Sequence, residues 1–321
     1  CISGTRGSGA VFFCGCNLKC VFCQNSEISR GGGGKEVTSE RLGEIFVELK
    51  NSGAHNINLV TPTHYARQIR TAIESVRSDI NIPFVYNCGG YESIDGLSHL
   101  TDYISVYLTD IKYFSDELAR RYSHCNDYFE RAVAALDFMI KTVGVPKYDK
   151  DGIMQSGVIV RHLVLPSHRH DSICLLNYLK ENFGTEGFRL SLMSQFTPNG
   201  GLADYPELNR RITTFEYNSV TDTAYDLGFP SDVALPFIVY DNTLIAATRG
   251  GEPFPAASIE GSVVTIARGW FEAAGFAKGA EVTFELAWTS ADGGTKNSAT
   301  VVVKVVNTRL GEIGSFDLGS K

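Results

Sequence analysis

Ala10-Val-Phe-Phe-Cys-Gly-Cys16-Asn-Leu-Lys-Cys20-Val-Phe-Cys23 is the stretch that decides the fold. Its apolar beginning predicts a first strand at 10–13, and three cysteines follow the strand at spacings of four and three. Three thiolates with this spacing can each bind one iron of a cubane and leave the fourth iron open to a substrate. The stretch therefore predicts a [4Fe-4S] cluster on Cys16, Cys20 and Cys23, directly after the first strand of a sheet.

Apolar runs and helical patterns alternate through the next two hundred residues. The further strands are expected at 57–60, 82–86, 104–108, 158–165 and 188–193. The helices between them are expected at 64–78, 93–100, 115–142, 170–183 and 214–227, the last with a capping box from Thr213 to Glu216. Buried strands separated by helices are typical of a parallel sheet. Six such units predict an α/β fold, a partial (β/α)₆ TIM-like barrel with its chemistry at the strand ends.

The composition changes after Phe229-Pro230. Short β-rich runs at 237–240, 263–266, 282–286 and 300–306 are separated by Gly250-Gly251 and Gly293-Gly294. We therefore expect two domains, 1–230 and 231–321, the second a small all-β sandwich. The run from Gly261 to Phe271 resembles the immunoglobulin-like X2 modules.

Charge and cysteine usage limit the partners and the compartment. The formal net charge is −7, which gives no broad basic surface for nucleic acid or an anionic membrane. No apolar run reaches the roughly 18 residues of a membrane helix. Five of the eight cysteines lie in the first 23 residues and none lies beyond Cys174, unlike a secreted disulfide framework. We expect a cytoplasmic protein, and, because the sequence begins with Cys1 rather than Met, further residues before it.

A structural zinc site is the alternative interpretation of the cysteine cluster. It would use the same three cysteines with Cys14 or a histidine as the fourth ligand. Zinc sites usually present paired CxxC knuckles, and the sequence has no second knuckle.

Four phrases carry a family resemblance that extends to about residue 228. They are Gly4-Thr-Arg-Gly-Ser-Gly9, the segment from Cys16 to Asn25, Asn58-Leu-Val-Thr-Pro-Thr-His64 and Val160-Arg-His-Leu-Val-Leu-Pro166. With them the chain resembles the radical S-adenosylmethionine (SAM) enzymes, and within these a subfamily similar to pyruvate formate-lyase activating enzymes. Phe22 also matches the aromatic position of the family pattern CxxxCxΦC.

The resemblance implies a reaction and partners. An electron donor such as a flavodoxin or ferredoxin would reduce the cluster, which would pass the electron to the sulfonium of SAM. Methionine and a 5′-deoxyadenosyl radical would result, and the radical would abstract hydrogen from a substrate. The branch implies activation of a glycyl radical enzyme. A radical enzyme acting on a small molecule or peptide, and a zinc-stabilised non-catalytic binding protein, are the alternatives.

The resemblance also implies cofactor-binding residues at the strand ends. Thr61 and Thr63 stand where the family usually has Gly-Gly-Glu for the amino group of SAM, although a plain strand-to-helix turn is the alternative. Asn87-Cys-Gly-Gly-Tyr91 resembles the Asp-Thr-Asn-Gly-aromatic turn of the activating enzymes. Asp110-Ile-Lys112 matches their Asp-x-Lys pattern, and a spacing of two puts both side chains on one face of a strand. A buried ion pair is the alternative for these two residues.

Two further positions complete the expected pocket. Arg161 and His162 are neighbours on a strand, so one faces the barrel interior and the other a helix, and we expect Arg161 to face inward and bind SAM. Gln195 follows the last strand, where the activating enzymes carry a SAM-contacting histidine. His168 and His170 are expected in a solvated loop.

Overall fold

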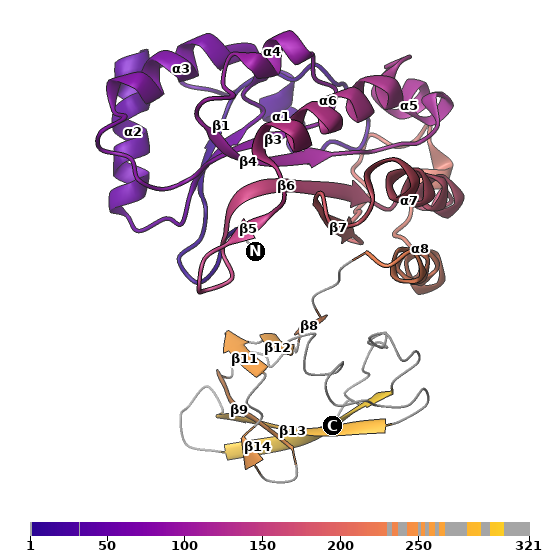
Figure 1. The fold of residues 1–321 in the computed structure, drawn as a ribbon. Helices are drawn as coiled ribbons and strands as arrows, with labels where there is room; N and C mark the ends of the chain where they lie inside the picture. The colour runs from indigo at the N-terminus through magenta and orange to yellow at the C-terminus, as the bar shows by residue number, and fades with distance from the viewer. Residues whose placement is uncertain are drawn as a thin grey trace. The chain divides into compact units, whose positions relative to one another are not determined.

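The structure is a computed structural model that describes residues 2–31 and 33–229, and seven strands after residue 230. The chain divides into two compact units, unit 1 (Cys1–Pro230) and unit 2 (Ser231–Lys321). Figure 1 shows the strands and helices of each unit with their labels.

A parallel sheet forms the centre of unit 1. Its strands pair in chain order, and a short strand β5 adds antiparallel to β6. The six parallel strands are β1 (Gly9–Phe12), β2 (Ile57–Val60), β3 (Phe84–Cys88), β4 (Ile104–Asp110), β6 (Met154–Leu163) and β7 (Arg189–Met193), and β5 is Lys147–Tyr148. Among the described residues β1 and β7 do not pair with each other, so the sheet is open. The expected α/β class with a parallel sheet is confirmed, in the strand order of a partial barrel.

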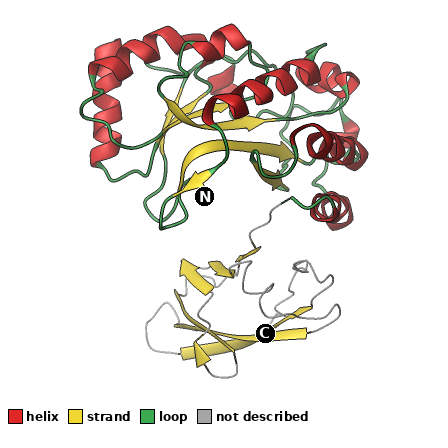
Figure 2. Cartoon of the chain, in the orientation of Figure 1, coloured by secondary structure: helices red, strands yellow, loops and turns green. Residues whose placement is uncertain are grey.

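Helices follow the strands in alternation, and Figure 2 shows them arranged around the outside of the sheet. The helices of unit 1 are α1 (Ser26–Ser29), α2 (Ser39–Asn51), α3 (Ala66–Ser75), α4 (Ile94–Ser98), α5 (Asp116–Ser123), α6 (Tyr128–Val143), α7 (Arg169–Phe183) and α8 (Thr214–Asp226), with 3₁₀ turns η1 (Thr63–Tyr65) and η2 (Pro206–Leu208). Side-chain caps start several of them. The Thr38 hydroxyl accepts from the Arg41 N–H at the start of α2, and the capping box expected at Thr213 and Glu216 is confirmed at α8.

The single helix expected at 115–142 is wrong, because the chain breaks it into α5 and α6. His124 ends α5 in the left-handed conformation, with φ 54°, and its N–H donates to the Ala119 carbonyl. A left-handed residue cannot continue a right-handed helix. The break separates Ser123, the last residue of α5, from Tyr128, the first of α6, and both side chains reach toward the strand ends.

The two faces of the sheet have different cores. The outer face packs on the helices, and its strand residues share one buried cluster with helix residues such as Phe46 and Leu136. The inner face carries a separate apolar cluster of Val85, Val106, Leu108, Met154 and Ile159. Since side chains alternate along a strand, the residues two positions beyond Val85, Leu108 and Ile159 also lie on the inner face. These are Asn87, Asp110 and Arg161, so the inner face becomes polar toward the carboxyl ends of the strands.

A glycine brings the loop after β3 close to the end of β4. Gly90 has φ 85°, and a Cβ atom there would lie 2.0 Å from the Asp110 carbonyl oxygen. Only glycine fits such an approach without displacing backbone. The turn after β3 therefore packs directly against the backbone at the end of β4.

Unit 2 is described through the backbone of its strands. They are β8 (Val233–Pro236), β9 (Thr243–Arg249), β10 (Glu252–Pro253), β11 (Ala257–Glu260), β12 (Val263–Ile266), β13 (Glu281–Thr289) and β14 (Lys296–Lys304). They form two antiparallel sheets, in the orders β10-β9-β13-β14 and β11-β12-β8. The expected run 237–240 lies outside the described residues. The immunoglobulin-like sandwich stays a prediction.

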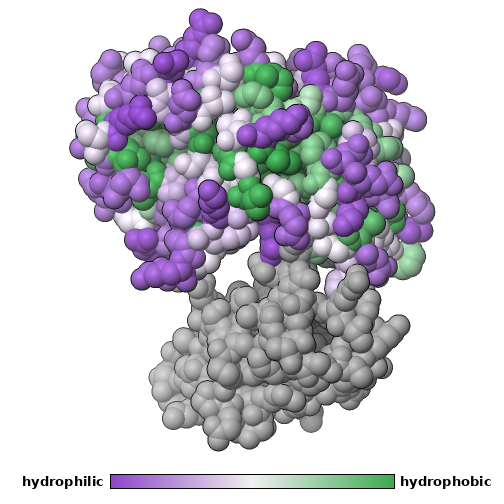
Figure 3. Space-filling view, in the orientation of Figure 1, coloured by the Kyte–Doolittle hydropathy of each residue, from purple (hydrophilic) through white to green (hydrophobic). Residues whose placement is uncertain are grey.

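Six large hydrophobic side chains are exposed in the described part of unit 1. Its exposed large hydrophobic side chains are dispersed along the chain: Phe12, Val37, Ile94, Val145, Tyr148 and Phe215. Apolar residues lie between hydrophilic ones on the face drawn in Figure 3. Single exposed side chains of this kind are normal on a folded domain. In the part of the chain that the structure describes, no helix combines the length and apolar character needed to cross a membrane.

Candidate cofactor site

The cysteine loop lies between β1 and α1 and is fixed by buried side chains. Leu18 and Phe22 are 5% and 8% exposed. The Phe22 ring packs edge-on against Tyr113 and Phe196, with centroids 6.5 and 5.9 Å apart. The Val21 N–H donates to the Tyr122 carbonyl at 2.8 Å. These contacts give Phe22 a packing role, and its contact with SAM stays a prediction.

The three thiols of the loop act electrostatically on one another. Burial raises the pKa of the Cys16 and Cys20 thiols; the charges of Cys20 and Cys23 raise the pKa of Cys16 further, and the charge of Cys23 raises that of Cys20. The Lys112 ammonium group lowers both. Cluster ligands are thiolates, so a buried cation beside them favours the ligating form.

Each of these thiols has a hydrogen-bond partner. The Ser123 hydroxyl donates to Cys20 Sγ at 3.0 Å, and the Leu18 N–H donates to Cys16 Sγ at 3.4 Å. Cys23 Sγ lies 3.5 Å from Ser29 Oγ. Cys20 is the most buried of the three, at 9% exposed, while Cys16 and Cys23 are half-buried.

The described residues contain no group of three His, Cys, Asp or Glu side chains that could hold a metal ion. Cys14 points to Gly34, where a Cβ atom would lie 2.1 Å from its sulfur. The described residues thus do not decide between the zinc site considered from the sequence and the cluster. A cubane gives each thiolate its own iron, so its ligands stand further apart than those of one ion. Three thiolates are a donor set that suits such a cluster, and the assignment of the three cysteines as its ligands stays a prediction.

Four polar residues meet on the inner face of the sheet, at the ends of β3, β4 and β6. Asp110 accepts from Arg161 Nε at 2.7 Å through Oδ1 and from Lys112 Nζ at 2.5 Å through Oδ2. Arg161 Nη2 donates to Asn87 Oδ1 at 2.8 Å. We call Asn87, Asp110, Lys112 and Arg161 the inner polar group. The ion pair considered for Asp110 and Lys112 is thus present, and it is shared with Arg161.

The inner polar group is strongly charged and largely buried. The side chains of Asp110, Lys112 and Arg161 are 15%, 17% and 25% exposed. Burial raises the pKa of Asp110, but the Lys112 and Arg161 cations outweigh it and hold that pKa below its usual value. Burial alone would lower the pKa of Lys112. The negative charges of Asp110 and Cys20 outweigh burial, so the pKa of Lys112 is raised above its usual value. Asp110 and Lys112 are therefore charged at neutral pH.

Arg161 and His162 face opposite sides of β6. His162 is 2% exposed, with Nδ1 2.7 Å from the Ile111 carbonyl oxygen and Nε2 2.8 Å from Ser172 Oγ on α7. Burial lowers its pKa, which keeps the imidazole neutral. The structure thus puts Arg161 on the inner face and His162 against a helix. The contact between Arg161 and SAM stays a prediction.

The loop after β2 carries a backbone of unusual conformation. Thr61 has φ 58°, which is rare for a β-branched residue, and its N–H donates to the Asn87 carbonyl at 2.8 Å. Strained residues of this kind concentrate at functional sites. Thr63 starts η1, and its hydroxyl donates to Glu92 Oε2 at 2.7 Å.

Glu92 is a buried acid that the sequence alone did not single out. It follows β3, is 4% exposed, and has a pKa raised to about 7 by burial. A carboxyl group therefore lies beside Thr63, although the loop after β2 that carries Thr63 does not supply it. Glu92 comes from the loop after β3. The only signal was a charged residue directly after the Gly-Gly-Tyr turn.

Two of the expected residues lie elsewhere. Gln195 is exposed, and its amide donates to Met193 Sδ at 3.4 Å rather than to the inner polar group. His168 is not a solvated loop residue, because it is half-buried and its Nε2 lies 2.7 Å from the Tyr122 hydroxyl. His170 is exposed in the first turn of α7.

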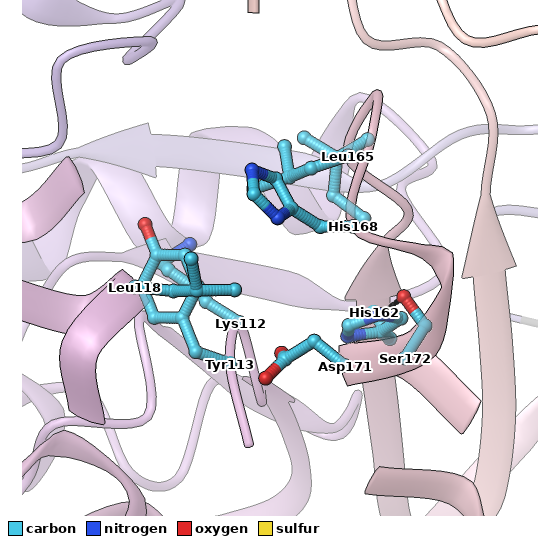
Figure 4. Close-up of a pocket in the computed structure, with 9 residues that line it drawn as sticks. Lys112, Tyr113, Leu118, His162, Leu165, His168, Asp171 and Ser172 are labelled. Carbon is cyan, nitrogen blue, oxygen red and sulfur yellow. Dashed lines mark hydrogen bonds between the residues drawn. The ribbon is translucent and has the colours of Figure 1, made fainter. Parts of the chain in front are cut away.

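A small pocket lies beside the inner polar group and shares Lys112 with it. Its lining is Lys112, Tyr113, Leu118, His162, Leu163, Leu165, His168, Asp171 and Ser172 (Figure 4). The Asp171 carboxylate accepts from the N–H groups of Phe114 and Ser115 at 2.9 and 2.8 Å. Asp171 thereby fixes the loop that follows Lys112, which makes its role in this pocket structural.

Comparison with known proteins finds similarity to the core of unit 1. Residues 10–154 match the family model of the radical SAM superfamily. An uncharacterised protein of Methanocaldococcus jannaschii is 30% identical over 229 residues, covering 68% of this chain and 62% of that protein. The 7-carboxy-7-deazaguanine synthase of Methanothermobacter thermautotrophicus is 27% identical over 151 residues, 45% of this chain and 60% of the enzyme. The chain spans less than two thirds of the length of either relative.

Solved structures are similar at lower identity. Streptococcus suis SuiB bound to S-adenosylmethionine is 13% identical with a TM-score of 0.48, over 70% of this chain and 48% of that one. Escherichia coli coproporphyrinogen III oxidase (HemN) is 13% identical with a TM-score of 0.46, over 68% of this chain and 51% of that one. The family match is confined to residues 10–154, less than half of the chain, and the radical SAM superfamily uses a [4Fe-4S] cluster and S-adenosylmethionine as cofactors.

Proposed function

We propose that unit 1 holds a [4Fe-4S] cluster on Cys16, Cys20 and Cys23 and cleaves SAM reductively into methionine and a 5′-deoxyadenosyl radical. The cluster and SAM supply the radical chemistry when bound, and the protein supplies binding, orientation and shielding from water. The observation that carries the proposal is the position of Lys112. Its ammonium group acts on Cys16 and Cys20 on one side and pairs with Asp110 on the other.

The inner polar group has hydrogen-bond donors to spare for the amino acid end of SAM. A guanidinium group has five donors, and Arg161 uses two of them within the described residues. Lys112 has three and uses one. The remaining donors suit a carboxylate, which they can bind by charge-assisted hydrogen bonds. Asp110 keeps unused lone pairs for a cationic amino group, and Asn87 completes this part of the proposed pocket.

The other proposed contacts surround this group. Thr61 and Thr63 offer hydroxyl and backbone carbonyl oxygens at the end of β2, where the amino group of SAM needs acceptors. Phe22 supplies an apolar wall next to the cysteine loop. Gln195 would have to leave Met193 to reach the cofactor.

Anaerobic reconstitution with iron and sulfide, followed by dithionite and SAM, tests the proposal. We expect about four irons per chain and formation of 5′-deoxyadenosine. Cys20→Ala should lose both, whereas Cys125→Ala, a matched change of another buried cysteine, should keep both. Full iron content and SAM cleavage in Cys20→Ala would disprove the ligand assignment. Tightly bound zinc and intact SAM would instead favour the non-catalytic binding protein.

We further propose that the radical activates a glycyl radical enzyme, with a flavodoxin or ferredoxin as electron donor in the cytoplasm. The support is the likeness of the strand-end phrases, above all Asp110-Ile-Lys112, to those of the activating enzymes. The test is electron paramagnetic resonance (EPR) of a glycyl radical after the reduced protein and SAM are mixed with a glycyl radical enzyme. A deuterated partner glycine should transfer its label to 5′-deoxyadenosine.

A small-molecule substrate is the second candidate. It is favoured by the 27% identity to an enzyme of 7-carboxy-7-deazaguanine synthesis. Formation of 5′-deoxyadenosine that rises on addition of a small molecule, without a protein radical, would support this candidate over the first. For unit 2 we propose an immunoglobulin-like sandwich that serves as a spacer or docking module.

A further inference from the structure

One hydrogen-bonded chain of hydroxyls ends on a cysteine of the loop. Ser123 Oγ donates to Cys20 Sγ at 3.0 Å, and Tyr113 Oη lies 2.8 Å from Ser123 Oγ. Ser123 is the last residue of α5, and Tyr113 follows β4. The two residues come from one strand–helix unit, and Cys20 comes from a segment about a hundred residues earlier.

The direction of these bonds follows from counting hydrogens. A serine hydroxyl has one hydrogen, and Ser123 uses it toward Cys20. Tyr113 must therefore donate to Ser123 Oγ. Both donors point toward the sulfur, and such aligned bonds polarise one another.

The chain lies in a dry part of the molecule. Tyr113 is fully buried, Ser123 is 2% exposed and Cys20 is 9% exposed. In a low-dielectric interior a hydrogen bond to a charged acceptor is stronger than in water. The contacts of Cys16 and Cys23 are longer, at 3.4 Å from the Leu18 N–H and 3.5 Å from Ser29 Oγ, whose hydrogen goes to the Ser26 carbonyl, and both cysteines are half-buried. Cys20 therefore receives the strongest hydrogen bond of the three.

We propose that Ser123, oriented by Tyr113, is a positioning residue that raises the reduction potential of the cluster through Cys20. This inference rests on the proposed function, since it requires Cys20 to ligate the cluster. Reduction adds one electron from a low-potential donor, and the added negative charge spreads to the ligand sulfurs. A hydrogen bond donated to such a sulfur is stronger in the reduced state, so it favours reduction. Removal of the donor makes the potential more negative.

The test is a redox titration of the reconstituted protein without SAM, followed by EPR of the reduced cluster. In Ser123→Ala we expect the equilibrium constant for reduction to fall about tenfold, which is about 59 mV for one electron. Ser123→Thr keeps the hydroxyl and should restore the potential. Tyr113→Phe keeps the ring but loses the second donor, so its potential should lie between those of the wild type and Ser123→Ala.

Two controls separate the hydrogen bond from burial. Ser172→Ala removes another hydroxyl that is 2% exposed but bonds to His162, and it should leave the potential unchanged. Ser29→Ala removes the longer contact to Cys23 and should shift the potential less than Ser123→Ala.

The outcomes distinguish the inference from the proposed function. A wild-type potential in Ser123→Ala with full iron content overturns the inference alone. If Ser123→Ala fails to assemble the cluster, Tyr113→Phe decides, and an unchanged potential in that variant has the same meaning. Absence of a cluster in the wild type, or its retention in Cys20→Ala, overturns the proposed ligand set itself.

Discussion

Glu92 is a buried acid whose ionisation should weaken the fold of unit 1. It is 4% exposed, and the groups that hydrogen-bond to it are Thr63, Cys88 and Tyr86, none of which is a cation. Burial raises its pKa from 4.5 to about 7, and these three partners only partly oppose the rise. We therefore expect Glu92→Gln, which imitates the protonated acid, to remove a pH-dependent cost.

The sign and size of this cost follow from proton linkage. Between pH 4.5 and about 7 the unfolded chain releases the Glu92 proton while the folded chain keeps it. The folded state binds more protons, so the free energy of unfolding falls as pH rises through this window and levels off above it. The interval between the two pKa values corresponds to about 3 kcal/mol.

Urea unfolding followed by far-ultraviolet circular dichroism measures the effect, because all helices that the structure describes lie in unit 1. We expect the unfolding free energy of Glu92→Gln relative to the wild type to increase by about 2.5 kcal/mol between about pH 5 and about pH 8. The difference at the lower pH reports the changed hydrogen bonds together with the small part of the linkage cost that is already present there. Glu181→Gln, which removes an exposed carboxyl group from α7, is the control without this increase. A Glu92→Gln difference that does not vary with pH would refute the reasoning.

Three further predictions concern the inner polar group and the core. Asp110→Asn leaves the buried Lys112 and Arg161 cations without an anion, so it should cost about 3 kcal/mol in urea unfolding; an unchanged midpoint would show that the group is solvated. Arg161→Lys keeps the charge but loses the planar fork, so calorimetry of the reconstituted protein should show SAM binding weakened about tenfold; equal affinity would remove Arg161 from the pocket. Phe46→Ala empties a fully buried ring site and should cost about 3–5 kcal/mol of unfolding free energy, against less than about 1 kcal/mol if the site can collapse.

The parallel sheet of unit 1 was predictable because its signal is local. Continuous apolar runs separated by amphipathic stretches mark buried strands and covering helices, and the chain order of the strands then follows from short connections. The position of Asp110 on the inner face of the sheet was also predictable in part, because side-chain alternation puts it on the same face as Lys112. Alternation could not decide which of Arg161 and His162 faces inward, because it only says that they differ.

The features that the sequence did not show depend on contacts between distant segments. The break after Ser123 depends on a left-handed residue, His124, which carries no glycine or proline signal. Glu92 became notable only when Thr63, from another loop, was found beside it. An exposed Glu in such a loop would look the same in the sequence. Burial by segments far apart in the chain is what changes the chemistry of these residues.

Lys112 shows why the cluster loop and the inner face should respond together. Its ammonium group is shared between the thiols of Cys16 and Cys20 and the carboxylate of Asp110, which also pairs with Arg161. A ligand that draws Asp110 or Lys112 toward itself changes the charge felt at the sulfurs. Conversely, loss of thiolate charge weakens the balance that keeps Lys112 buried and protonated. The two halves of the site are thus coupled through one cation, so a variant of the inner polar group should alter the electrostatics of the cysteine loop without touching it.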